Sequence, residues 1–134
     1  MLRYLLDTDT AIAAIRRRSG VDFARFSEHA GTLAISSISV CELQFGAERS
    51  ADPGRNRHAL EEFFSLLRVL DFDADAGAHA AEIRAQLAST GTPIGPYDTL
   101  IAGAARSRGL IVVTGNTRGF GRADGLRVVD WMRG

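Results

Sequence analysis

The chain has 134 residues, 46% of them apolar, and a formal net charge of zero. This length predicts a single domain over residues 1–134 that can bury a substantial core. The charge balance argues against a protein that holds nucleic acid by bulk positive charge alone.

All 16 basic residues are arginine. Arginine binds phosphate bidentately, which lysine does not. Codon bias in a GC-rich genome would give the same composition, and we favour that explanation unless other features support phosphate binding.

Cysteine usage and the amino-terminal segment limit the class of protein. Cys41 is the single cysteine, which excludes an intrachain disulfide and a cysteine-based metal cluster. The first apolar run is short and is interrupted by Asp7, so it does not read as a signal peptide. No segment has the length of a membrane span, and we expect a soluble, cytoplasmic protein.

The first half of the chain alternates strand and helix patterns. Short apolar runs predict buried strands at residues 3–6 and 32–36. Helices are predicted at residues 11–18 and 21–29, and from Ser37 or Ser39 to residue 47. Residues 50–54 predict a loop, and residues 56–67 predict a helix with one apolar stripe.

The second half continues this alternation. Strands are predicted at residues 68–72, 110–113 and 127–129, the last at a sheet edge. Helices are predicted at residues 75–89 and 97–108, and Gly109 ends the second. Residues 90–96 and 114–124 predict loops. The whole pattern is typical of an α/β domain with a mainly parallel sheet of four or five strands and helices on both faces.

Five polar residues are candidates for a site beyond the carboxyl ends of the strands, where such sheets bind ligands. Asp7 follows the first strand and Glu42 lies early in the helix after the second. Asp98 begins the helix before the fourth strand, and Thr114 and Asn116 follow that strand. We expect all five side chains to meet at one rim of the sheet.

Each of these residues alone has an ordinary explanation. Asp7 and Asp98 could cap helices, and Asn116 could be a turn residue. Glu42 is harder to explain, because an unpaired carboxylate in an apolar neighbourhood is costly. The hypothesis of a site therefore depends on the set.

Clustered carboxylates raise one another's pKa values, and a hard divalent cation relieves their repulsion. Mg²⁺ and Mn²⁺ prefer oxygen ligands, and no His or Cys is placed to suggest zinc. The set predicts metal-assisted hydrolysis of a phosphodiester, in which an oriented water attacks in line.

Four segments of the chain resemble known motifs. They are residues 4–9 (Tyr-Leu-Leu-Asp-Thr-Asp), 35–43 (ending Cys-Glu-Leu), 95–102 (beginning Gly-Pro-Tyr-Asp) and 113–120 (beginning Val-Thr-Gly-Asn). In this order and spacing they resemble PIN-domain ribonucleases of the VapC type, the toxin half of a bacterial toxin–antitoxin pair. The similarity extends to Trp131 and implies a Rossmann-like PIN fold.

The resemblance implies roles for the five residues. Asp7, Glu42 and Asp98 would bind metal, with Asn116 helping directly or through water. Thr114 would support these metal ligands or position substrate. Asn116 stands where many PIN domains carry a fourth Asp, which favours one Mg²⁺ (or Mn²⁺) over two.

Two other positions depart from the family pattern. Asp9 stands where Asn is common and would shift the local charge. Gly119 replaces the usual acid before Phe120, with little expected effect.

The resemblance also implies a substrate and partners. The substrate would be RNA, with tRNA cut in the anticodon region; residues 82–85, 95–96 and 106–110 resemble members that target initiator tRNA. The partners would be a VapB-type antitoxin inserted near the acids and a second copy of the chain, with DNA bound only through the antitoxin. The side chains that could form a groove or dimer face, or equally plain core, are Phe23, Phe26, Phe45, Phe63 and Phe64.

Two alternatives remain open at this stage. One is a decayed PIN fold acting as an RNA-binding or regulatory protein, against which the three retained carboxylates argue. The other is a Rossmann-like nucleotide-binding domain or a phosphatase. A dinucleotide fingerprint is absent, and a phosphatase with Asp7 as nucleophile would need a lysine that this chain lacks.

Overall fold

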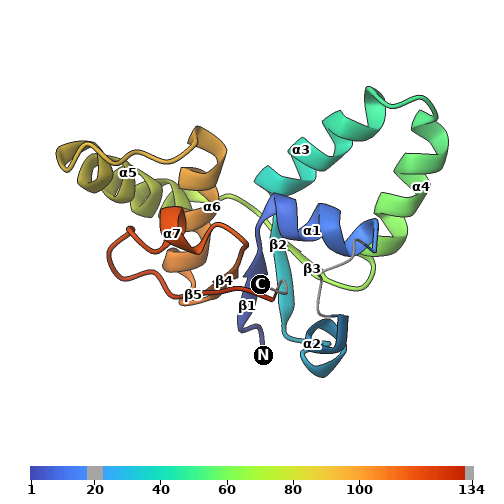
Figure 1. Cartoon of the computed structure of the whole chain (residues 1–134), viewed down its shortest axis with the longest axis horizontal. Coiled ribbons are helices and arrows are strands. Elements are labelled where there is room, and N and C mark those ends of the chain that lie inside the picture. Colours follow the sequence, from blue (N-terminus) through green and yellow to red (C-terminus); the bar gives the residue numbers. More distant parts are fainter. Residues whose placement is uncertain (18–22, 132–134) are drawn as a thin grey trace.

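The computed structural model describes residues 1–17 and 23–131, and these form a five-stranded parallel sheet with helices around it (Figure 1). The strands are β1 (Tyr4–Leu6), β2 (Leu33–Ser36), β3 (Arg68–Leu70), β4 (Ile111–Val113) and β5 (Val128–Val129). The helices are α1 (Thr8–Ile15), α2 (Phe23–Glu28), α3 (Ser37–Glu48), α4 (Pro53–Phe64), α5 (Ala74–Ser89), α6 (Pro96–Ser107) and α7 (Thr117–Phe120). The expected α/β class is confirmed.

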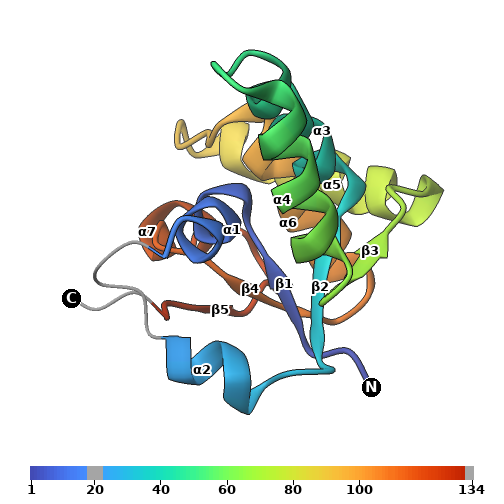
Figure 2. The ribbon, with the colours of Figure 1, turned by 90° about the vertical axis from the view of Figure 1, so that its right-hand side faces the viewer.

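Alternate residues of the central strands face two different helix layers. Leu5 and Val112 belong to a core with α5, α6 and Phe120. Leu6 and Val113 face the opposite side, where Phe26 and Trp131 pack, and Ile35 packs there against α1, α3 and α4. Figure 1 shows α5 and α6 on the left of the strands and α3 and α4 on the right, and Figure 2 shows α2 near the end of the sheet where β1 begins. The expected helices on both faces are confirmed.

The order of the strands places a switch point at the centre of the sheet. The order is β3-β2-β1-β4-β5, so the chain runs outward from β1 in both directions. Leu6 is in register with Ile35 of β2 and Val113 of β4. The carboxyl ends of three strands therefore lie level, and the residues that follow them share one rim.

The structure has one helix that the sequence did not predict, and one helix that begins earlier than predicted. α7 lies inside the expected loop at residues 114–124, because the Asn116 side chain accepts a hydrogen bond from Gly119 N and caps a short turn of helix. α4 begins at Pro53, within the expected loop at residues 50–54, since Asp52 caps it and proline suits the first helical position.

Other boundaries shift by a few residues at most, as is usual for helix and strand ends. Residues 18–22, which include the end of one predicted helix and the start of the next, lie outside the described residues. Gly109 ends α6 with a φ of +67°, as the sequence predicts. Within residues 1–17 and 23–131, none of the helices combines the length and apolarity that crossing a bilayer requires.

Candidate active site

Asp7 joins the ends of β1 and β4. Its Oδ1 accepts a hydrogen bond from Thr10 N (2.8 Å) and caps α1, as expected for an aspartate at this position. Its Oδ2 accepts from the Thr114 hydroxyl at 2.6 Å, across 107 positions of sequence. The residue is 4% exposed. Capping alone requires only one oxygen, so the second bond is what ties Asp7 to the rim.

Thr114 and Asn116 continue this network. Thr114 is completely buried, and its hydroxyl oxygen also accepts a hydrogen bond from Asn116 N at 2.9 Å. The Asn116 Oδ1 accepts from Gly119 N at 3.1 Å, so the amide oxygen is already engaged in capping α7. Thr114 is thus a positioning residue for Asp7, and Asn116 has one remaining lone pair for a ligand or water.

Glu42 is held by residues that the sequence analysis did not single out. Its Oε1 accepts a hydrogen bond from the Thr8 hydroxyl at 2.6 Å, and Thr8 Oγ1 lies 2.9 Å from the hydroxyl of the fully buried Ser39. Thr8 follows Asp7 directly, and Ser39 is one turn before Glu42 on α3. In the sequence, these two spacings were the only indication that Thr8 and Ser39 could lie near Glu42.

Asp98 lies in the first turn of α6 without acting as its cap. The N-cap is Gly95, and no hydrogen bond to the Asp98 carboxylate is found among the described residues. The capping explanation considered from sequence therefore fails for Asp98. A half-buried carboxylate without a hydrogen-bond partner is available to a ligand.

The electrostatics of the rim are those of an uncompensated acidic cluster. Burial, reinforced by the charges of Asp7, Asp9 and Glu42, raises the pKa of Asp98 to about 6. Burial also raises the pKa of Asp7, although its hydrogen bonds from Thr114 and Thr10 oppose that shift. The charges acting on Asp98 show that the predicted acids converge, and that Asp9 adds to them.

The oxygen atoms at the rim suit a hard cation that takes only a few of its ligands from the protein. The side chains that build the rim offer carboxylate, hydroxyl and amide oxygens. In the described part of the chain, no three His, Cys, Asp or Glu side chains form a ready-made metal cage. Mg²⁺ commonly binds one or two carboxylates and keeps several waters, so the rim fits it without such a cage.

Gly119 contributes space at this rim. A Cβ at Gly119 would lie 2.5 Å from the Asn116 Nδ2. A larger residue at this position would therefore displace the Asn116 side chain from its capping position. The small effect expected from glycine on the proposed site stays a prediction.

The predicted phenylalanine surface is mostly core. Phe26 packs on Trp131, and Phe63 and Phe64 are partly buried against the sheet. The side chain of Phe23 lies outside what the structure describes. Phe45 alone of the other four is strongly exposed, at 62%.

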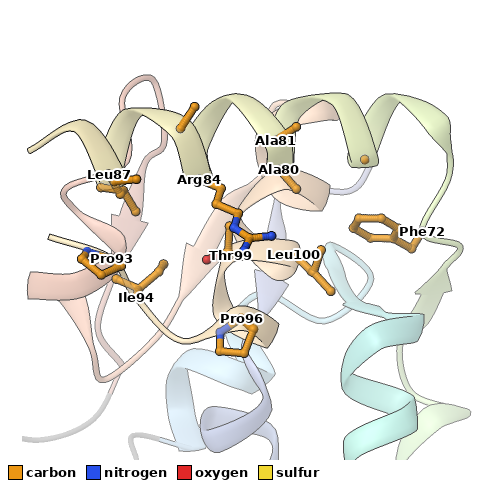
Figure 3. A pocket seen from close by; sticks show the side chains of 13 residues that line it. Phe72, Ala80, Ala81, Arg84, Leu87, Pro93, Ile94, Pro96, Thr99 and Leu100 are labelled. Carbon is orange, nitrogen blue, oxygen red and sulfur yellow. The ribbon is translucent and has the colours of Figure 1, made fainter. Parts of the chain in front are cut away.

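Two hollows lie between the helices. A cavity of about 800 Å³ lies between α5 and α6, where Arg84 reaches from α5 toward Thr99 (Figure 3). None of the rim acids lines it. A smaller groove of about 190 Å³ runs between α1, α3 and α4, with Ile12, Leu43 and Leu60 among its walls, and Glu42 belongs to its lining. The second hollow therefore leads to the acidic rim.

Comparison with known proteins agrees with this architecture. The PIN domain profile matches residues 4–126. The chain is 49% identical to the "tRNA(fMet)-specific endonuclease VapC" of Shigella flexneri, over 98% of this chain and 99% of that protein. It is 44% identical to "Ribonuclease VapC2" of Haemophilus influenzae, over 98% of this chain and all of that protein. The crystal structure of DNA-bound VapBC from Salmonella typhimurium superposes with a TM-score of 0.93 at 49% identity, covering 98% of this chain and 99% of that one.

Proposed function

Since the chain belongs to the PIN-domain family, and within it to the VapC-type members, we propose that it is a toxic endoribonuclease whose active site is the acidic rim. The observation that carries this proposal is the Asp98 carboxylate. It lacks a hydrogen-bond partner among the described residues, and its pKa is raised to about 6 by burial and by three neighbouring acids. A cluster that is electrostatically unfavourable on its own is expected where a cation and a phosphodiester bind.

Asp7, Asp98 and Glu42 would hold one Mg²⁺ or Mn²⁺, either directly or through waters bound to the cation, with Asn116 assisting in the same way. The bound cation would supply charge neutralisation at the phosphodiester and favour deprotonation of the attacking water. Thr114 and Thr10 fix the Asp7 carboxylate, and Thr8 fixes Glu42. Asp98 carries no such bond among the described residues, so its carboxylate would orient the attacking water and take up its proton. The water oxygen would bond to phosphorus in line as the P–O bond to the leaving ribose oxygen breaks, and that oxygen would take a proton from solvent.

For the substrate, we propose tRNA, with initiator tRNA cut in the anticodon region as the specific target. The support is the printed specificity of the Shigella relative, which is 49% identical over nearly its whole length. An RNA substrate of this kind places the protein's action in the cytoplasm.

For the partner, we propose a VapB-type antitoxin that lies in the groove between α1, α3 and α4. This groove is lined mainly by apolar and small residues and also by Glu42, so a segment with apolar side chains and one arginine would match it. The Salmonella structure contains DNA-bound VapBC, and we propose that DNA binding here also belongs to the antitoxin. A homodimer of the toxin stays a prediction.

The proposal is tested by incubating the purified chain with total bacterial RNA and Mg²⁺ and mapping the new RNA ends. The expected result is one dominant cut in the anticodon loop of initiator tRNA. If the chain cut other RNA and left initiator tRNA intact, the proposal that initiator tRNA is the specific target would be wrong. No cleavage of any RNA, together with no Mn²⁺ binding by calorimetry, would favour a decayed PIN fold.

A further inference from the structure

Two exposed aromatic side chains lie on the helices that carry Glu42 and Asp98. Among the described residues, Tyr97 is 51% exposed and directly precedes Asp98 on α6, while Phe45 is 62% exposed on α3. Phe45 is three residues after Glu42, so the two share one side of α3, about 4.5 Å apart along its axis. Since α3 also packs against α6, the two aromatic residues lie on neighbouring helices that each carry one of the rim acids, Glu42 on α3 and Asp98 on α6.

Neither ring has a structural purpose that the described residues reveal. Tyr97 belongs to no core cluster, and its hydroxyl has no hydrogen-bond partner in that part of the chain. Phe45 contacts the guanidinium of Arg49, which lies 5.6 Å from its ring centroid. Arg49 has no carboxylate partner among the described residues, so its charge is available to an external anion.

We propose that Tyr97 and Phe45 each stack one unpaired nucleobase, on opposite sides of the phosphodiester held at the rim, and that Arg49 contacts a phosphate of the same strand. This inference rests on the proposed ribonuclease function. Nucleobases released from a helix stack on aromatic side chains whatever their identity, whereas paired bases are unavailable. The two rings would therefore bind the unpaired nucleotides on either side of the cut in the proposed substrate.

The charge of the chain supports this assignment. With a net charge of zero, the protein lacks the bulk attraction that gives many RNA-binding proteins their affinity. Stacking supplies affinity that depends little on ionic strength, and one arginine adds a salt-dependent part. Substitution of Tyr97 should thus weaken RNA binding by the same factor at low and at high salt. Substitution of Arg49 should reduce the slope of log affinity against log salt concentration by about one.

The test uses the full chain carrying Asp7→Asn, so that RNA is bound without being cut. The probes are an RNA hairpin with 2-aminopurine at the loop nucleotides on either side of the mapped cut, and the same sequence fully paired. Binding is measured by anisotropy and stacking by 2-aminopurine quenching. The variants are Y97A, Y97F, Y97L and F45A, with L66A as the matched control, because Leu66 is 74% exposed and lies outside the rim.

We expect Y97A, Y97L and F45A each to weaken hairpin binding about tenfold and to abolish quenching at one flank. Y97F and L66A should bind as the parent does, and the duplex should be insensitive to all of them. Y97L keeps an apolar side chain but removes the ring, so it tests whether stacking is required. If its thermal unfolding transition matches the parent's, its weaker binding does not come from unfolding.

Hairpin binding by Y97A, Y97L and F45A equal to that of L66A would overturn the inference while leaving the ribonuclease proposal intact. The same would hold if these variants weakened only the binding of a VapB-type antitoxin. If the Asp7→Asn parent bound no RNA and the wild-type chain cut none, both proposals would fail together.

Discussion

Asp7 serves the fold and the proposed chemistry through the same carboxylate. Oδ1 caps α1, and Oδ2 accepts from buried Thr114. The sequence showed that Asp7 follows a strand and precedes a helix, which is enough to predict the cap. It could not show Thr114 as the second partner, because that bond depends on β1 and β4 being neighbours in the sheet.

Two substitutions separate these roles. Asp7→Asn keeps an oxygen for Thr10 N and replaces a buried charge by a neutral amide, but its Nδ2 cannot accept the Thr114 hydroxyl proton, so we expect only a small change in the free energy of unfolding. Asp7→Ala removes both hydrogen bonds and should cost more, about 1–3 kcal/mol. Both should lower RNA cleavage by on the order of a hundredfold or more. Urea unfolding and single-turnover cleavage check this, and an Asp7→Asn chain as unstable as Asp7→Ala would contradict it.

Asp98 should make stability depend on pH in an unusual direction. Its folded pKa of about 6 lies above the ordinary value of 3.8, so the folded state holds this proton more tightly than the unfolded state. The free energy of unfolding should therefore fall as pH rises from about 4 through 6 in EDTA. Asp98→Asn should reduce that slope, whereas Glu61→Gln, an exposed acid outside the rim, should leave it unchanged. A slope equal in wild type and Asp98→Asn, measured by urea unfolding, would contradict the raised pKa.

At the scale of elements, α5 and α6 depend on a close approach at one glycine. A Cβ at Gly103 would lie 2.5 Å from Ala80 N and 2.6 Å from Ala80 Cα, and these are backbone atoms that cannot turn aside. Gly103→Ala should therefore destabilise the chain by about 1–3 kcal/mol. Gly46→Ala is the control, because its Cβ meets nothing within 4 Å in α3, and it should stabilise by up to about 1 kcal/mol. Thermal unfolding distinguishes them, and equal effects of the two substitutions would disprove the contact.

The element boundaries that sequence reasoning missed share a physical cause. α7 has only four residues, too few for a periodic apolar pattern, and it exists because Asn116 caps it and Phe120 is fully buried. α4 starts at Pro53 in a segment whose turn-forming residues also suit a helix N-terminus. In both cases a side chain that caps the helix determines where it begins, and the same residue types are also typical of loops.

At the scale of the whole molecule, the alternation of strands and helices was enough to predict the parallel sheet and its two helix layers. Strand order was not available from periodicity, and that order brings Asp7, Glu42 and Asp98 together. Thr8 and Ser39 were missed because a hydroxyl next to an acid carries no pattern of its own. The single domain over residues 1–134 stays a prediction, and the PIN profile covers residues 4–126.

The most direct test of the acidic rim is the single-turnover rate of RNA cleavage as Mg²⁺ is titrated from an EDTA-treated state, in wild type and Asp98→Asn. We predict no cleavage in EDTA, a rate that saturates with Mg²⁺ in wild type, and a rate at least about a hundredfold lower in Asp98→Asn at every concentration. Full-rate cleavage in EDTA, or by Asp98→Asn, would contradict a metal-dependent ribonuclease centred on these carboxylates.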